Sequence, residues 1–171
     1  GAFAEDPGWQ IYKSDSVVNY EAGIKGRAGD LTYDLSAFYI DWSDPQLNTA
    51  TTNWGFFAVQ NGSSAQTKGI EAQVNGYLSD QWHYNVGYAY VDAELTDDFF
   101  APDNAATPVA IDGAQLPGAP KHMLNWALDY THTMSSNWIL FARVDGSYQS
   151  KSRNGVGVSP TFNVPIDGFS L

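Results

Sequence analysis

The chain has 171 residues, with 19 Asp and Glu against 8 Lys and Arg, a formal net charge of −11 and no Cys. The lack of Cys excludes a disulfide scaffold and a Cys-based metal site. The acidic balance argues against a nucleic-acid partner, because phosphate binding needs clustered Lys and Arg.

Period-two alternation of apolar and polar residues dominates the chain, and it is typical of a strand with one apolar and one polar face. It predicts six strands, over residues 18–26, 31–42, 67–78, 82–95, 121–131 and 138–149, and a seventh that begins near Thr161. In the third strand, Ile70 and Ala72 fall on one face while Glu71 and Gln73 fall on the other. Most of these strands exceed the usual length of about 5–6 residues and reach the roughly 9–11 residues that cross a bilayer.

The connections between the predicted strands alternate between short and long. Short turns fall at residues 27–30, 79–81 and 132–137, and long polar stretches at 43–66, 96–119 and 150–160. Soluble domains rarely repeat loops of more than about 15 residues. Transmembrane β-barrels have short periplasmic turns and longer extracellular loops, so the rhythm favours a barrel.

Aromatic residues make up 15% of the chain and gather near the ends of the predicted strands. Those near short turns are Tyr33, Trp82 and Trp138, and those near long loops are Tyr20, Tyr39 and Tyr90. Two such levels are typical of the aromatic girdles at the two membrane interfaces. The alternation alone also fits a soluble antiparallel sheet with an apolar inner face.

We therefore predict an all-β fold, an antiparallel transmembrane β-barrel segment of six to seven strands. Its polar face is expected to line the lumen, with Glu21, Asp34, Glu71, Gln73, Asn125, Asp129 and Asp145. An eight-stranded barrel is filled by its own side chains. A lumen this polar needs a wider barrel, so we expect residues 1–171 to be part of a larger one.

Five strings in the sequence resemble, in the same order, strand motifs of TonB-dependent outer-membrane receptors. They are SVVNYEAGIKG (16–26), LSAFYIDW with DPQL (35–47), NG followed by KGIEAQ (61–73), GYAYVDAE (87–94) and LPGAPKH (116–122). The resemblance implies a barrel of about 22 strands with a plugged lumen. It also implies that the plug domain, the TonB box and the early and final strands lie outside this sequence.

By the same resemblance, the function would be TonB-energised uptake of a scarce nutrient at the bacterial outer membrane, with a ferric siderophore as the expected ligand. The expected partners are outer-membrane lipid or lipopolysaccharide, the TonB–ExbB–ExbD complex and the small-molecule ligand. Two alternatives are a passive porin-like channel and a soluble β-sheet module that binds carbohydrate or acts as an adhesin. A soluble module would be recovered without detergent.

Two groups of residues are candidates for binding a ligand. Trp54, Phe56 and Phe57 lie in the first long connection, where their rings could stack on a siderophore catecholate or a sugar ring. The alternative is that they pack the loop against its neighbours or insert into the outer leaflet. Arg143, next to Asp145 on the predicted lumen face, could bind an acidic ligand or the plug, or could form a lumenal ion-pair network.

Five acidic residues, Asp92, Glu94, Asp97, Asp98 and Asp103, gather where a strand meets a loop. A Ca²⁺ site needs several converging oxygens, but the spacing is not that of an EF-hand, so we expect a solvated acidic loop.

The three histidines, His83, His122 and His132, stand on separate strands or turns, and we expect no metal site. The sequence shows no Ser/His/Asp triad, no phosphate-binding loop and no catalytic carboxylate pair. We therefore expect no cofactor and no catalytic residue, and we interpret the chain as a non-enzyme.

Overall fold

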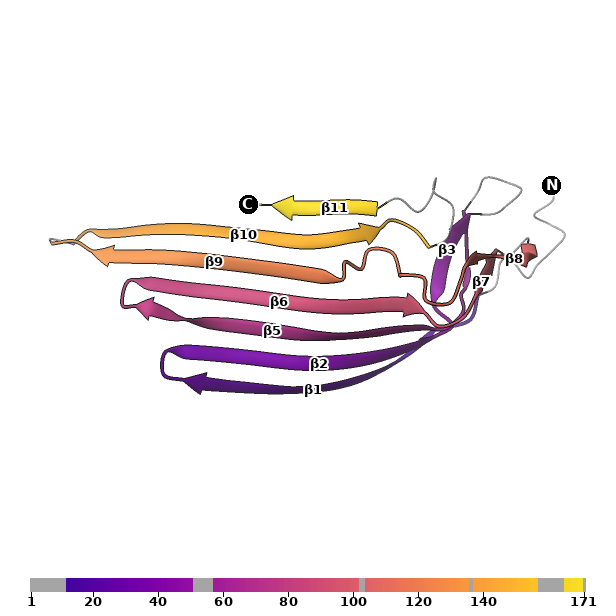
Figure 1. The fold of residues 1–171 in the computed structure, drawn as a ribbon, viewed down its shortest axis with the longest axis horizontal. Helices are drawn as coiled ribbons and strands as arrows, with labels where there is room; N and C mark the ends of the chain where they lie inside the picture. The colour runs from indigo at the N-terminus through magenta and orange to yellow at the C-terminus, as the bar shows by residue number, and fades with distance from the viewer. Residues whose placement is uncertain (1–11, 51–56, 102–103, 136, 157–164, 171) are drawn as a thin grey trace.

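A computed structural model describes residues 12–50, 57–101, 104–135, 137–156 and 165–170. Seven strands form one antiparallel sheet in the order β1-β2-β5-β6-β9-β10-β11 (Figure 1). Their bounds are Ser16–Ala28 (β1), Leu31–Ser43 (β2), Ala65–Ser79 (β5), Trp82–Leu95 (β6), His122–Thr133 (β9), Ile139–Arg153 (β10) and Pro165–Ser170 (β11). All seven predicted strands are present, and most extend a few residues beyond the predicted ends. In the described ranges, no helix is long and apolar enough to span a membrane.

The short turns lie together at one end of the sheet, and the long connections lie at the other (Figure 1). The β1–β2 turn is only Gly29 and Asp30, and Gly29 has a φ of 62°, a left-handed conformation that glycine adopts without steric cost. Asn137, in the β9–β10 turn, also has a positive φ, of 63°. These turns fix the register of each hairpin.

One face of the sheet carries a broad band of exposed apolar side chains, which we call the apolar belt. Its members share a face because they pair across neighbouring strands: Ile24, Leu35, Ile70, Val86, Leu140 and Val144 are among them. Ile24 is 59% exposed and Leu140 is 52% exposed. No second layer of the described residues covers this face, and soluble monomers rarely expose large continuous apolar patches, so the apolar belt favours a surface that faces lipid.

Aromatic rings border the apolar belt at both ends. At the long-loop end, Tyr20 pairs with Tyr39, and Tyr90 pairs with His122; we call these four residues the long-loop aromatic row. At the short-turn end, the ring of Trp82 lies 4.8 Å from that of Tyr130. Tyr90 and Trp82 stand eight residues apart on β6, or roughly 26 Å at about 3.3 Å per residue. With a strand tilt of about 35–45°, this length spans roughly 19–22 Å along the membrane normal, so the two aromatic levels border most of an apolar band of about 25 Å.

The first two long connections contain two short hairpins that the sequence analysis did not predict. Strands β3 (Gln46–Ala50) and β4 (Phe57–Asn61) form one, and β7 (Phe99–Ala101) and β8 (Asn104–Ala110) form the other. The hairpins are also linked to each other, because Gln60 Nε2 donates to the carbonyl oxygen of Phe100 at 2.6 Å. The described parts of these two connections therefore contain more regular structure than their polar composition suggests.

A small apolar core, which we call the loop core, lies beneath these hairpins. It consists of Leu47, Ala65, Ala93, Leu95, Phe99, Ala110 and Leu116. Ala65 and Leu95 pair across β5 and β6 on the same face as Glu71, which is the face opposite the apolar belt. The hairpins therefore pack over the polar face at the long-loop end of the sheet.

The buried position of Leu95 leads to a prediction about the loops. Leu95 is 0% exposed, so Leu95→Ala in the receptor that contains this chain should destabilise the hairpins by about 2–5 kcal/mol. Hydrogen exchange of the β7–β8 amides should become faster. Leu78→Ala is the matched control, because Leu78 lies outside the loop core and is 71% exposed. Equal exchange in the two variants would contradict the prediction.

Candidate functional site

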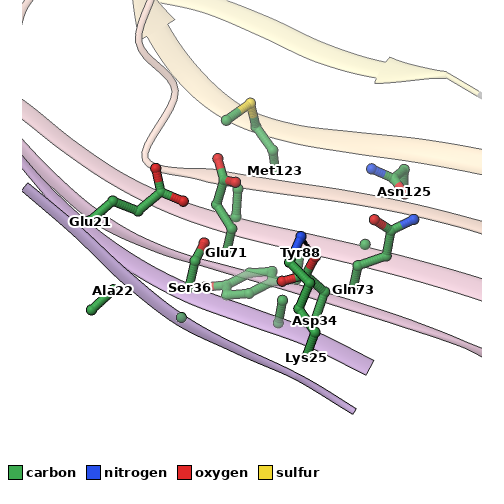
Figure 2. Close-up of a pocket in the computed structure, with 14 residues that line it drawn as sticks. Glu21, Ala22, Lys25, Asp34, Ser36, Glu71, Gln73, Tyr88, Met123 and Asn125 are labelled. Atoms are coloured by element: carbon green, nitrogen blue, oxygen red, sulfur yellow. Dashed lines mark ion pairs between the residues drawn. The ribbon is translucent and has the colours of Figure 1, made fainter. Parts of the chain in front are cut away.

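The face opposite the apolar belt, which we call the polar face, contains a hollow of about 850 Å³ (Figure 2). Two rows of paired residues explain where the hollow lies. One row runs Gly23, Ser36, Glu71, Ala89 and Met123, and the next runs Lys25, Asp34, Gln73, Gly87 and Asn125. Each row crosses β1, β2, β5, β6 and β9.

Small residues in these rows leave room between the larger polar ones. Gly87 faces Asn125, and a Cβ at position 87 would come within 2.6 Å of the Asn125 side-chain oxygen. Gly23 lies so close to β2 that a Cβ there would come within 2.8 Å of the Leu35 carbonyl oxygen. The hollow therefore depends on residues that lack bulk as much as on those that carry charge.

The hollow is acidic. Lys25 Nζ and Asp34 Oδ2 form an ion pair at 2.8 Å. Glu21 and Glu71 also line the hollow, and neither forms an ion pair within the part of the chain that the structure describes. Two carboxylates are left uncompensated, so the hollow suits a positively charged group.

A second polar group crosses the same face closer to the short turns. His83 Nε2 lies 2.9 Å from Asn75 Oδ1, and His83 Nδ1 lies 3.3 Å from Asp129 Oδ2. Arg143 then joins β9 to β10, with its guanidinium 3.1 Å from Asp129 Oδ1 and 3.1 Å from Asp145 Oδ1. We call this chain of contacts the polar ladder, and it connects four neighbouring strands of the sheet.

The structure divides the predicted lumen residues between these two groups. Glu21, Asp34, Glu71, Gln73 and Asn125 line the hollow, whereas Asp129 and Asp145 belong to the polar ladder. That this face lines the lumen stays a prediction. The set missed Ser36, Gly23, Gly87 and Met123, which line the hollow as well. These four residues stand at alternate positions along their strands, in step with the predicted polar residues, and this spacing could have placed them on the same face.

Two of the four predicted ligand-contact residues, Arg143 and Phe57, lie within the described residues, and they stand on different strands. Arg143 lies in the polar ladder and is held by two carboxylates, as the ion-pair alternative proposed. Phe57 is the first residue of β4 and pairs with Ala50. Trp54 and Phe56 lie outside the described residues. A role for these residues in ligand binding stays a prediction.

The acidic residues near the end of β6 have different partners and do not form one site. Asp92 and Glu94 form ion pairs with Lys68 and Lys121, and Asp98 Oδ1 accepts a hydrogen bond from the Asp112 amide at 3.0 Å. Asp103 lies outside the described residues. Across the described ranges, no group of three or more His, Asp and Glu residues could hold a metal ion.

The chain matches the family described as "TonB dependent receptor-like, beta-barrel" over residues 10–171. It therefore belongs to the TonB-dependent receptors of the Gram-negative outer membrane, and it forms part of their β-barrel domain. The predicted family, the all-β barrel fold and the outer-membrane location are confirmed. With β1 and β11 as its edge strands, the described sheet does not close into a barrel.

The chain is similar to two receptors of Pseudomonas aeruginosa. It is 31% identical to the ferripyoverdine receptor over 88 residues, which are 47% of this chain and 11% of that protein. It is 33% identical to the metal-pseudopaline receptor CntO over 122 residues, 68% of this chain and 15% of that protein. The chain thus spans 11–15% of the length of these curated relatives.

A solved structure has the same fold. The ferric yersiniabactin uptake receptor FyuA from Yersinia pestis superposes with a TM-score of 0.63 at 17% sequence identity. The match covers 83% of this chain and 20% of the FyuA chain. The family and the named relatives are receptors, which agrees with the expectation of a non-enzyme at the level of the family.

The polar ladder leads to a prediction about barrel stability. Arg143→Gln removes the cation that Asp129 and Asp145 share, so two carboxylates remain close together without compensation. Asp145→Asn removes only the more exposed of the two acceptors. We expect Arg143→Gln to lower the unfolding temperature of the full receptor more than Asp145→Asn does, as measured by heat-modified mobility on gels. The reverse order would contradict the prediction.

Proposed function

We propose that the receptor containing this chain takes up a scarce nutrient across the outer membrane with energy from TonB, and that its ligand is a ferric siderophore. The observation that carries the proposal is one sheet with a lipid-type apolar belt on one face and an acidic hollow on the other. Relatives named as receptors for ferripyoverdine and metal-pseudopaline support the ligand class.

The two alternative functions have weaker support. A soluble carbohydrate-binding or adhesin module would have to expose the apolar belt to water, which is unfavourable over so large an area. A passive channel needs an open lumen, whereas here two linked hairpins pack over the polar face at the long-loop end. We also infer that the protein is not an enzyme and needs no cofactor.

The acidic hollow supports a role in holding the plug domain. In the proposed receptor the polar face lines the lumen, and a plug occupies that lumen. Glu21 and Glu71 would then meet ammonium or guanidinium groups of the plug, since a carboxylate away from bulk water is stabilised by a paired cation. Trp54, Phe56 and Phe57 remain our candidates for contact with the ligand.

The proposed uptake is tested by growth. A strain that lacks the gene for this receptor should lose growth on one or more ferric siderophores as the only iron source, and the intact gene should restore it. Restoration should fail in a strain without TonB. Growth that depends on the gene but not on TonB would support the passive channel instead. Recovery of the protein in the soluble fraction would contradict both transport functions.

The proposed contact with the plug gives a separate prediction. Glu21→Gln combined with Glu71→Gln should let the plug unfold at a lower urea concentration, because two ionic contacts are lost while the side-chain size is kept. Channel current across a planar bilayer reports the opened lumen. Asp30→Asn combined with Asp80→Asn, in the β1–β2 and β5–β6 turns, is the control that removes two negative charges away from the hollow. An unchanged urea dependence in the double variant would refute the contact.

A further inference from the structure

Four charged residues form a cluster on the face of the apolar belt, at the long-loop end. Lys68 Nζ lies 3.3 Å from Glu94 Oε1 and 3.7 Å from Asp92 Oδ2, and Lys121 Nζ lies 2.6 Å from Asp92 Oδ1. Gln66 Nε2 donates to Glu94 Oε1 at 2.7 Å. We call Lys68, Asp92, Glu94 and Lys121 the outer charge cluster, and neither the hollow nor the polar ladder includes any of them.

Register places the outer charge cluster at the border of the apolar belt. Lys68 pairs with Tyr39, and Tyr90 is two residues from Asp92 on the same side of β6. The long-loop aromatic row therefore lies level with the cluster or just below it. Aromatic rows mark the depth of lipid headgroups, so the ammonium groups stand at headgroup depth on the side that faces lipid.

The burial of the four side chains is unequal. The carboxylate side chains of Asp92 and Glu94 are 14% and 24% exposed, whereas those of Lys68 and Lys121 are 48% and 45% exposed. The carboxylates lie against the sheet and hold the lysines, and the ammonium groups form the outer layer. Hydrogen bonding to Asp92 also raises the pKa of Lys121, which lies outside the strands, so its charge persists at any physiological pH.

We propose that the outer charge cluster binds the phosphate of an anionic lipid headgroup in the outer leaflet, with Lys68 and Lys121 as the two donors. Each ammonium has three N–H donors, and the cluster occupies only some of them. The acyl chains below the headgroup would lie on the apolar belt, beside Ile70 and Val86. The proposal rests on the membrane placement of the belt and not on the transported ligand, so a failed lipid titration leaves the uptake test unaffected.

The test measures lipid binding to the full receptor in neutral detergent by native mass spectrometry. The probes are lipid A with both phosphates and the same lipid A after dephosphorylation. Lys68→Gln and Lys121→Gln should each weaken binding of the phosphorylated probe by about fivefold, and the double variant by roughly 25-fold, with little change for the dephosphorylated probe. Lys68→Arg and Lys121→Arg should restore most of the affinity.

Two further variants separate lipid binding from simple stability. Lys121→Gln with Asp92→Asn keeps the charge balance, so the receptor should fold while still losing phosphate affinity. Lys25→Gln is the matched control, because Lys25 is also paired with an aspartate but lies on the polar face. Equal binding of the two probes, or an equal loss of affinity in Lys25→Gln, would overturn the proposal. Unchanged affinity in the double lysine variant would show that the cluster is only an internal ion-pair network.

Discussion

The alternation of side chains across a strand is the constraint on which this structure depends. Because successive residues point to opposite faces, each long strand must satisfy lipid on one side and water or protein on the other. Backbone N–H and C=O groups within the bilayer must also be paired, which strands achieve only with neighbours on both sides. The five inner strands of the described sheet have neighbours on both sides, and the two edge strands, β1 and β11, are the places where further barrel strands would pair.

The same alternation builds the functional surface without any dedicated loop. Antiparallel register carries one residue from each strand into a row, so a polar position on one strand meets polar or small positions on its neighbours. Ser36 beside Glu71, and Gly87 beside Asn125, show how small residues open a hollow between larger ones. The polar ladder arises in the same way, from Asp129 opposite both His83 and Arg143. Charge, size and register therefore act together on this face.

Much of the sheet could be predicted from the sequence, because the alternation of apolar and polar residues is visible within each strand. The alternation arises because the two faces of a strand meet different surroundings. Strand 82–95 was predicted with its observed ends, and the seven polar residues expected on one face do share it. The β3–β4 and β7–β8 hairpins could not be predicted, since they are held by segments far apart in the sequence. Gln60 donates to the carbonyl oxygen of Phe100, 40 residues away, and Leu47 and Leu116 belong to the same core. Pairing of Asp92 with Lys121, 29 residues away, was hidden for the same reason.

The two faces exchange character at the long-loop end, and this exchange locates the membrane border. Along β5 and β6 the lipid side changes from Ile70 and Val86 to Lys68, Asp92 and Glu94, while the opposite side changes from Glu71 to Ala65 and Leu95. The strands continue without a break in register there, so only the surroundings have changed. Beyond the bilayer, the lipid side meets water and can carry charge, and the opposite side is covered by the hairpins and becomes apolar. On each strand the change takes place between successive residues of one face, such as Ile70 and Lys68. It lies beside Tyr39 and Tyr90, because the boundary between lipid and water is where aromatic rings are most stable.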